Sequence, residues 1–209
     1  MEALRVIEKV TSKIAPGRAP SFIEVHVIKA LETISAEAYV GRTKLSEILG
    51  LGEGATRTLL RHLRNEGLIE VSKSGIVLSK PGGKVLSGLR SRISEEIEIQ
   101  KTPLTVGPFS IAVLVRNAAS SVKYGIEQRD AATKVGALGA TTLVFRRKKL
   151  TMPGVSEDIF QHIQSIHDTL ISELKPREND VIIIGSANEK RVAEFGAKTA
   201  AFELLKSTT

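Results

Sequence analysis

The sequence predicts an α+β protein of two domains, a helical N-terminal domain with a short β-hairpin and a C-terminal α/β domain. At 209 residues with 42% hydrophobic composition, the chain can fill two small cores. Residues 42–92 combine helical periodicity with two short strand patterns, whereas the chain beyond residue 108 alternates strand and helix patterns. Thr102-Pro103 and Gly107-Pro108 interrupt any helix near the junction. We therefore place the domains at 1–96 and 97–209.

An amphipathic helix is expected at the start of the chain. Residues 2–14 carry Leu4, Ile7, Val10 and Ile14 at spacings of three and four, and the pattern stops at Pro16-Gly17. This helix either packs on its own domain or contacts a second copy across a two-fold axis. The residues do not separate the two alternatives.

Two further helices follow, each with a start signal. Ser21 precedes Glu24 by three residues, which predicts a capping box for a helix over residues 21–35. Thr43 predicts the cap of a short helix that Gly50 ends. In a helix-turn-helix arrangement, this short helix would position the next one.

The next helix, over residues 55–67, has two opposite faces. Four apolar residues lie in one arc at 100° per residue: Ala55, Leu59, Leu60 and Leu63. Arg57, Arg61 and Arg64 lie in the opposite arc, where they face either a phosphate backbone or solvent. We favour the first, because residues 42–92 hold ten basic and four acidic residues in a chain of net charge +7. Glu53, Thr56 and Arg57 would then meet base edges.

Two short strands and another helix complete the domain. Residues 68–71 and 76–79 alternate like strands around Lys73-Ser74-Gly75, and Pro81-Gly82-Gly83 opens a helix. Helix, turn, basic helix, two-stranded wing and helix form the layout of a winged helix-turn-helix. Lys73 at the tip would approach a phosphate or the minor groove, although an exposed turn lysine needs no such role.

This layout predicts a DNA-binding surface. Its residues are Arg42, Lys44, Thr56, Arg57, Arg61, Arg64 and Lys73. The expected function is that of a transcriptional regulator, and the expected partners are double-stranded DNA and, since such heads usually act in pairs, a second copy in a homodimer. The alternative is a protein- or RNA-interaction adaptor whose winged helix does not bind DNA sequence-specifically.

The C-terminal domain has an alternating pattern. Strands are expected at 109–116, 140–146, 149–153 and 180–187. One helix is expected to end near Val135-Gly136, and two others are expected over 157–175 and 189–205. Strand, helix, two strands, helix, strand is the ferredoxin-like order, βαββαβ, here with one added helix. Small domains of this kind often dimerise or bind ligands, which is an analogy at the level of the fold.

Two polar segments there are candidates for binding a small-molecule effector. The turn Gly185–Asn188 follows a strand at a helix start, where backbone N–H groups favour an anion, although Asn188 as a simple helix cap explains the same residues and is favoured. The segment after Gly125 is either a pocket wall or the first turn of a helix. The candidate ligand-binding residues are Glu127, Arg129, Asp130, Gly185, Ser186 and Asn188.

A basic hairpin turn, Arg146-Arg147-Lys148-Lys149, is a third feature of this domain. It could add a contact to nucleic acid. Exposed turns are often charged, however, and lysine on edge strands opposes aggregation. The sequence favours the alternative that this turn is exposed to solvent and makes no contact to nucleic acid.

Several functions are not expected. The chain has no cysteine, and His162 and His167 are five residues apart, so they cannot share a metal ion as an i, i+4 pair could. No metal and no cofactor are expected. Catalysis is not expected either, because Ser186 has no evident base nearby and no Walker or nucleophile-elbow pattern occurs; an enzyme using the Gly185–Asn188 turn is the third hypothesis. The N-terminus lacks a continuous apolar run, which predicts a soluble cytoplasmic protein that does not enter membranes.

The chain also resembles known proteins. Residues 21–90 resemble the winged-helix domains of prokaryotic transcriptional regulators through LSEILGLGEGATRTLLRHLRNEGLIE and LSKPGGKVLS. The whole chain resembles a group of archaeal two-domain proteins, mainly through GIEQRDAATKVGALGATTLVF. That resemblance implies a regulator with a winged-helix head and a C-terminal domain of uncharacterised function, and it implies no ligand or catalytic residue.

Overall fold

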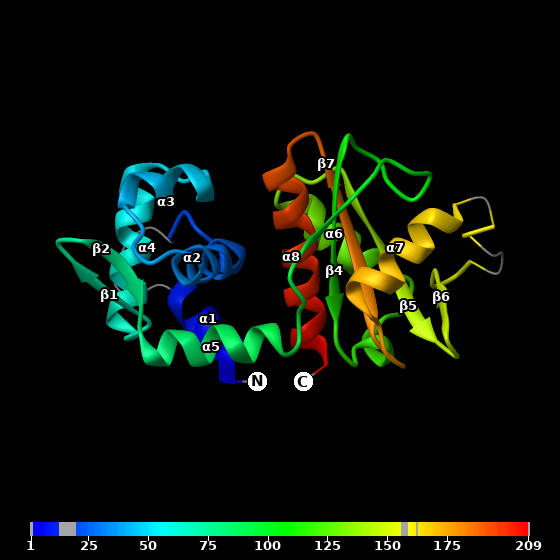
Figure 1. Cartoon of the computed structure of the whole chain (residues 1–209), viewed down its shortest axis with the longest axis horizontal. Helices are drawn as coiled ribbons and strands as arrows, with labels where there is room; N and C mark the ends of the chain where they lie inside the picture. Colours follow the sequence, from blue (N-terminus) through cyan, green and yellow to red (C-terminus); the bar gives the residue numbers. More distant parts are fainter. Residues whose placement is uncertain (1, 13–19, 156–158, 162, 209) are drawn as a thin grey trace. The chain divides into compact units, whose positions relative to one another are not determined.

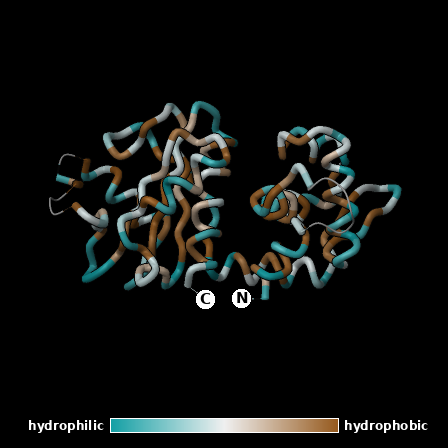
Figure 2. Tube along the Cα trace, turned by 180° about the vertical axis from the view of Figure 1, so that it is seen from behind, coloured by the Kyte–Doolittle hydropathy of each residue, from teal (hydrophilic) through white to brown (hydrophobic). Residues whose placement is uncertain are grey.

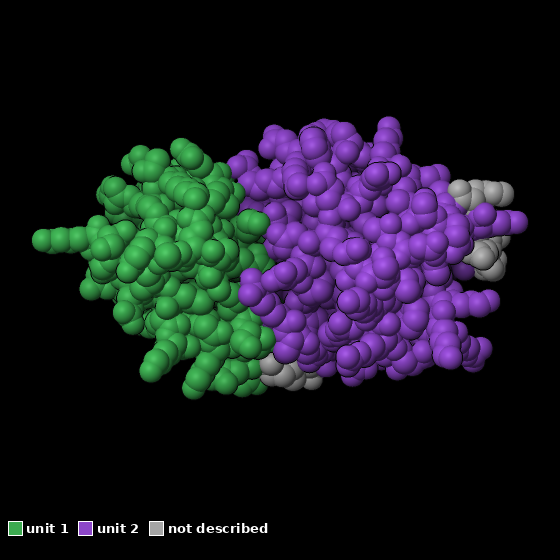
Figure 3. Space-filling view, viewed as in Figure 1, with its two compact units in different colours: residues 1–89 green, residues 90–209 purple. Residues whose placement is uncertain are grey.

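The computed structural model describes residues 2–12, 20–155, 159–161 and 163–208, which fall into two compact units, residues 1–89 and 90–209 (Figure 3). The expected class, a winged helix-turn-helix followed by an α/β domain, is confirmed. The boundary lies before the expected one at residue 96, because the chain already joins the larger sheet at Ile93, which bridges to Val115. The Arg116 N–H also donates to the carbonyl of Arg92 at 2.8 Å.

The N-terminal unit contains five helices and a hairpin among its described residues (Figure 1). They are α1 (Glu2–Thr11), α2 (Glu24–Ala36), α3 (Arg42–Leu49), α4 (Glu53–Asn65), β1 (Ile69–Ser72), β2 (Gly75–Leu78) and α5 (Lys80–Arg90). Helices α3 and α4 form the helix-turn-helix, and the antiparallel pair β1–β2 forms the wing. The order and type of these elements agree with the sequence-based expectation.

Helix α1 packs on its own unit. Ile7 and Val10 are fully buried, and the buried imidazole of His62 on α4 donates through Nδ1 to the carbonyl of Val10 at 2.7 Å. Of the two alternatives for this helix, packing within the unit thus accounts for its apolar face. The expected end of the helix, with Ile14 and Pro16-Gly17, lies outside the described residues.

The predicted start of α2 is wrong. The helix begins at Glu24, after Ile23 in an extended conformation, and the Ile23 N–H donates to Nδ1 of His26 at 3.2 Å. His26 thus satisfies an N–H at the helix start by reaching back along the chain, and Ser21 is not the cap.

The predicted start of α3 is also wrong, because the helix begins before the expected cap, Thr43. Gly41 is the extended residue before the helix, and Arg42 is its first residue, so Thr43 lies inside the first turn. The predicted end is correct: Gly50 adopts the left-handed conformation (φ 65°), and its N–H donates to the carbonyl of Glu47.

The start of α5 fixes the base of the wing. The Ser79 hydroxyl accepts the Gly82 N–H at 3.0 Å and donates to the Gly67 carbonyl at 2.6 Å. A Cβ on Gly82 would lie 2.1 Å from the carbonyl oxygen of Leu68. The segment around Pro81 therefore needs glycine, because the helix backbone touches the backbone that leads into β1.

The C-terminal unit is a five-stranded sheet with helices on both faces (Figure 1). Its elements are β3 (Ile97–Ile99), β4 (Phe109–Val115), the short 3-10 helix η1 (Ala119–Ser121), α6 (Ile126–Lys134), β5 (Gly139–Arg146), β6 (Lys149–Thr151), α7 (Gln164–Leu174), β7 (Val181–Ala187) and α8 (Lys190–Ser207). All neighbouring strands are antiparallel, in the order β3-β4-β7-β5-β6.

The order of elements along the chain is the expected one with an added strand, β3, but the order in space is not ferredoxin-like. A ferredoxin-like sheet places its last strand at an edge, whereas β7 lies between β4 and β5. All seven residues of β7 are buried, so the strand needs neighbours on both sides and helices on both faces. Helix α8 covers it closely, since a Cβ on Gly185 would lie 2.4 Å from the Ala193 carbonyl oxygen. The central strands form the hydrophobic interior of this unit (Figure 2).

The long helix expected over 157–175 is shorter. Helix α7 begins at Gln164 after Ile163, and residues 159–161 form a turn. Phe160 in that turn is buried and packs with Ile166 and Leu170 in the core beneath the sheet. Residues 156–158 and 162 lie outside the described part of the chain.

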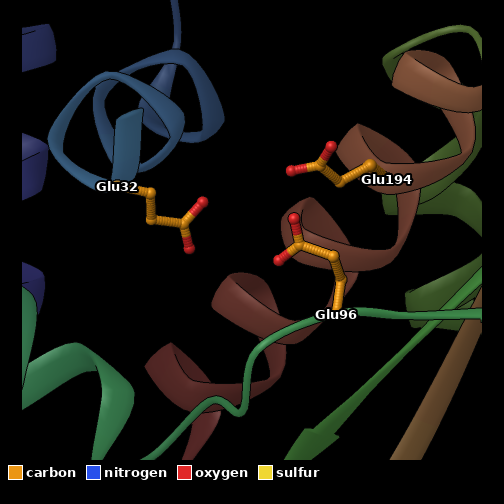
Figure 4. Close-up of side chains that lie close together, drawn as sticks. All are labelled: Glu32, Glu96 and Glu194. Carbon is orange, nitrogen blue, oxygen red and sulfur yellow. The ribbon is translucent and has the colours of Figure 1, made fainter. Parts of the chain in front are cut away.

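An ionic contact ties the segment before β3 to α8. The Lys198 ammonium lies 2.9 Å from a carboxylate oxygen of Glu96 and 2.7 Å from one of Glu194. Figure 4 shows these two carboxylates beside α8; Glu32 of α2, also drawn there, belongs to the N-terminal unit. The contact helps to explain why residues 90–96 belong to the C-terminal unit.

Candidate nucleic-acid interface

Helix α4 separates its side chains into a core face and a basic face. Leu59, Leu60 and Leu63 are buried, whereas the three predicted arginines are exposed: Arg57, Arg61 and Arg64. Because the leucines pack into the unit, the helix cannot rotate without exposing apolar surface. The arginine face is therefore fixed in orientation.

The turn between α3 and α4 sets the direction of α4. The Ser46 hydroxyl donates to the carbonyl of Leu51 at 2.5 Å, and the Leu51 N–H donates to the carbonyl of Ser46. Gly52 is extended (φ −64°, ψ 155°) before the first residue of α4. These bonds hold the tight turn that a helix-turn-helix requires.

The wing is anchored beside α3. Val40 forms a β-bridge with Ile76, through N–H to carbonyl bonds of 3.1 and 3.0 Å in both directions. Gly75 has φ 134°, and a Cβ there would lie 3.2 Å from the Val40 carbonyl oxygen. This close approach places the segment that leads into Arg42 next to the wing.

A groove of about 430 Å³ lies between α4 and the wing within the N-terminal unit. Four arginines line it: Arg42, Arg57, Arg61 and Arg64. Its apolar lining residues are Val40, Leu60, Val71 and Ile76. Guanidinium groups bind phosphates and guanine edges, and an apolar surface packs against deoxyribose or a thymine methyl group. The groove thus has the chemistry of a nucleic-acid contact.

The other predicted interface residues have different positions. Thr56 is a correction: it is fully buried, and its hydroxyl donates to the Gly52 carbonyl at 3.2 Å, so it cannot meet a base. Lys44 is exposed and lies 2.7 Å from a carboxylate oxygen of Glu37, outside the groove lining. Lys73 is exposed in the turn of the wing, as expected.

Among the groove residues that sequence reasoning did not assign to the interface are Val40, Asn65 and Val71. Val71 is 51% exposed, which is unusual for a valine in a strand. The alternation of β1 gives no signal for this exposure, because it places Val71 on the same side of the strand as the buried Ile69. Val40 has no signal in the sequence, because only its bridge to Ile76 brings it to the groove.

The turn expected at Gly185–Asn188 needs correction. Gly185 and Ser186 lie inside β7, and the Ser186 hydroxyl is buried 3.0 Å from that of Ser110. Their backbone groups belong to the sheet, so no free turn remains for an anion. Asn188 is exposed, and Glu189, not Asn188, is the residue before α8.

The charged groups at the start of α8 are engaged with acidic partners. Lys190 donates to a Glu98 carboxylate oxygen at 2.6 Å, and this hydrogen bond raises the pKa of Lys190. A guanidinium nitrogen of Arg191 lies 3.7 Å from Glu189. This partial neutralisation further weakens the case for an anion site here.

The second polar segment, after Gly125, forms the start of α6. This agrees with the alternative that the segment is the first turn of a helix. Gly125 is left-handed (φ 78°), and Glu127 is in the first turn. The side chains of Glu127, Arg129 and Asp130 are exposed, and Arg129 lies 3.1 Å from Asp130. The structure does not bring this segment together with Gly185–Asn188 at one pocket among the described residues.

Only one of the two histidines in the 157–175 segment, His167, lies within the described residues, so their relative position as metal ligands is not described. His162 lies outside the described residues. The His167 ring contacts Phe160 edge-on, with centroids 5.1 Å apart, and its Nδ1 lies 3.2 Å from Asp168. This hydrogen bond lowers the pKa of Asp168.

Comparison with known proteins agrees with the two-part organisation. Residues 27–93 match a family described as the CggR N-terminal DNA binding domain, and residues 106–204 match a domain of unknown function, DUF4443. A solved structure described as a hypothetical protein from Pyrococcus horikoshii OT3 is similar, with a TM-score of 0.68 and 28% identity over 86% of this chain and 92% of that chain. No curated protein matches the chain. The expected resemblance to archaeal two-domain proteins is confirmed.

The comparisons and the described helices bear on partners as well. The N-terminal unit is similar to a DNA-binding domain, which supports DNA as a partner. Among the residues that the structure describes, no helix has the length and apolar composition needed to cross a membrane.

Proposed function

We propose that this protein is a transcriptional regulator that binds double-stranded DNA through the groove between α4 and the wing. The observation that carries the proposal is the fixed arginine face of α4, with Arg57, Arg61 and Arg64 along one side of that groove. The similarity of residues 27–93 to a DNA-binding domain supports it.

The arginines differ in the task that this proposal gives them. Helix α4 rises about 1.5 Å per residue, so Arg57 and Arg64 lie roughly 10 Å apart along its axis. The start of such a helix enters the major groove, where Arg57 and Arg61 can reach guanine O6 and N7. Arg64, in the last turn, is assigned to the phosphate backbone with Lys73 of the wing.

The proposed regulator acts as a homodimer, because two heads related by a two-fold axis read half-sites about 34 Å apart. The C-terminal unit is the candidate for pairing the chains or for binding an effector. Analytical ultracentrifugation of the full chain tests the pairing; a monomer at the concentrations of DNA binding would contradict it.

Selection of bound fragments from the source genome tests the function. The wild-type protein is expected to enrich fragments that share a near-palindromic sequence, and Arg61→Ala is expected to lose this enrichment. Thr56→Val serves as a control on the same helix, because Thr56 is buried and faces away from DNA. Equal enrichment by wild type and Arg61→Ala, or no enrichment at all, would refute the proposal.

One alternative has its own supporting observation. The apolar side of the groove, with the half-exposed Val71, also suits an acidic and partly apolar protein segment. A winged-helix adaptor of this kind would show no retention of duplex DNA and would co-purify with a defined protein or RNA in an Arg61-dependent manner.

A further inference from the structure

Three loops meet at one end of the C-terminal sheet, where β4 and β5 end and β7 begins. They are residues 116–119, the β5–β6 turn at 146–149, and residues 175–180, and we call them together the basic loops. They contain seven basic residues and two acidic ones. The sequence shows only the middle segment as a basic cluster, because the other two are distant along the chain.

Hydrogen bonds between the basic loops show that they form one surface. The Asp180 carboxylate is buried and accepts hydrogen bonds from the Arg116 guanidinium at 2.6 Å and from the N–H groups of Asn117 and Arg177 at 2.8 Å each. The Arg147 N–H donates to the Glu178 carboxylate at 2.9 Å. Arg116 and Asp180 therefore hold two of the loops together from inside, and Glu178 joins the third, the β5–β6 turn, to them.

Five basic side chains on this surface are left to face solvent. They are Arg147, Lys148, Lys149, Lys175 and Arg177, all exposed. Within the part of the chain that the structure describes, none of their side chains forms an ion pair of 4.0 Å or less. Their charges are thus available to a partner.

The backbone of the basic loops is unusual at the same residues. The described non-glycine residues with positive φ are Asn117, Arg147, Lys148, Lys175 and Asn179, and all of them lie in these loops. A two-residue hairpin turn of this conformation favours Asn-Gly, and a left-handed residue at a helix end favours glycine. Arg147, Lys148 and Lys175 occupy these positions instead. Stability of the fold does not explain that choice, whereas selection for charge does.

We propose that the basic loops bind the phosphate backbone of double-stranded DNA as a second contact surface, separate from the groove of the N-terminal unit. The surface is polyvalent and cationic and has no pocket or aromatic platform among its named residues, which suits phosphates rather than bases. The choice of DNA over another polyanion rests on the proposed function.

The proposal assigns no base recognition to the basic loops. Their contribution is to affinity and to its salt dependence, because each phosphate contact adds about 0.9 to the slope of log K against log salt. Sequence preference would remain a property of α4. The C-terminal unit thereby acquires a binding role that the N-terminal unit alone does not supply.

The test measures the affinity of the full chain for a non-specific duplex by fluorescence anisotropy over a series of salt concentrations. The loop variant carries Arg147→Asn, Lys148→Gly and Lys175→Gly, which remove three charges and suit the left-handed backbone. A matched control removes three exposed charges elsewhere in the same unit, through Lys101→Gln, Lys123→Gln and Lys134→Gln.

For the loop variant, the slope of log K against log salt is expected to be shallower by roughly two to three, at about 0.9 per lost contact. The matched control is expected to have the same slope as wild type. The loop variant is also expected to melt at the same temperature as wild type or higher. If the loop variant melts at a lower temperature, a second variant replaces it in the comparison. This variant carries Lys149→Gln and Arg177→Gln, at positions without positive φ. A loop variant parallel to wild type would overturn the proposal.

A head variant, Arg57→Ala with Arg61→Ala, separates the two proposals. If the head variant alone changes the slope, the basic loops have no role and the proposed function stands. If the loop variant alone changes it, the surface proposed here stands and the groove of α4 does not bind DNA. Wild-type binding without salt dependence would overturn both, and a loop effect on RNA but not on duplex DNA would overturn the choice of DNA.

Discussion

The arginine face of α4 and the basic loops carry similar charge on different supports. The α4 arginines lie on a regular helix whose leucines hold it in place. The basic loops hold Arg147, Lys148 and Lys175 in left-handed conformations, and two of the three loops are joined by the buried Asp180. A basic residue on a solvated helix face is neutral for the fold. A basic residue in a left-handed turn is unfavourable for it, so its presence is stronger evidence of a function.

The largest expected difference between the two surfaces follows from removing Asp180. Asp180→Ala leaves the Arg116 guanidinium and the N–H groups of Asn117 and Arg177 without their acceptor, so the free energy of unfolding should fall by about 3 kcal/mol. Urea denaturation measures this. Glu178→Ala, an exposed carboxylate of the same loop, is the control and should cost much less; equal effects would show that the loops are not held from inside.

The head arginines should behave in the opposite way. Arg57→Ala with Arg61→Ala is expected to weaken duplex binding by about 2 kcal/mol or more, roughly thirtyfold, because each base contact is worth about 1–3 kcal/mol. The urea midpoint should remain near that of wild type, since surface substitutions change stability by about 0.5 kcal/mol or less. A large loss of stability would mean that these arginines support the fold of the unit.

Replacing a basic residue by glycine should change the stability of the protein in opposite directions on the two surfaces. Lys175→Gly is expected to stabilise the protein by roughly 0.5–1 kcal/mol, because glycine tolerates the left-handed conformation. Arg57→Gly is expected to destabilise it by about 1 kcal/mol, because glycine is unfavourable inside a helix. Thermal melts of the two single variants compare them directly. If both variants changed the stability in the same direction, the left-handed backbone would not be unfavourable for Lys175.

The smallest expected effect is that of Thr56→Val on DNA binding. Thr56 neighbours Arg57 but is buried against the start of α4. Duplex affinity should change less than about twofold, while the lost hydrogen bond should lower stability by about 1 kcal/mol. A marked loss of affinity in an anisotropy titration would restore Thr56 to the interface.

These contrasts show which features the sequence predicts. The two faces of α4 follow from local periodicity, because Leu59 and Arg61 on one helix turn have fixed angular positions. The wing and the glycine at the end of α3 also have local signals. The sequence misplaces Thr56 because a hydroxyl suits both a DNA contact and a bond to the helix backbone, and the residue type does not distinguish them.

Other features depend on contacts between distant residues. The position of β7 between β4 and β5 arises from pairing across the sheet, although its continuous apolar run does indicate a central strand. The groove needs Val40 beside the wing. The basic loops need Arg116 beside Lys175 and the β5–β6 turn beside Glu178. In the sequence, the turn at 146–149 resembles an ordinary solvated turn, because its neighbours in space are far away along the chain.

The proposed function depends on contacts between the arginines of α4 and DNA. The most direct measurement is the salt dependence of duplex affinity for wild type and Arg61→Ala. Loss of Arg61 is expected to lower the magnitude of the slope of log K against log salt by about 0.9 and to weaken binding at every salt concentration. Coincident lines for the two proteins, or lines without slope, would contradict it.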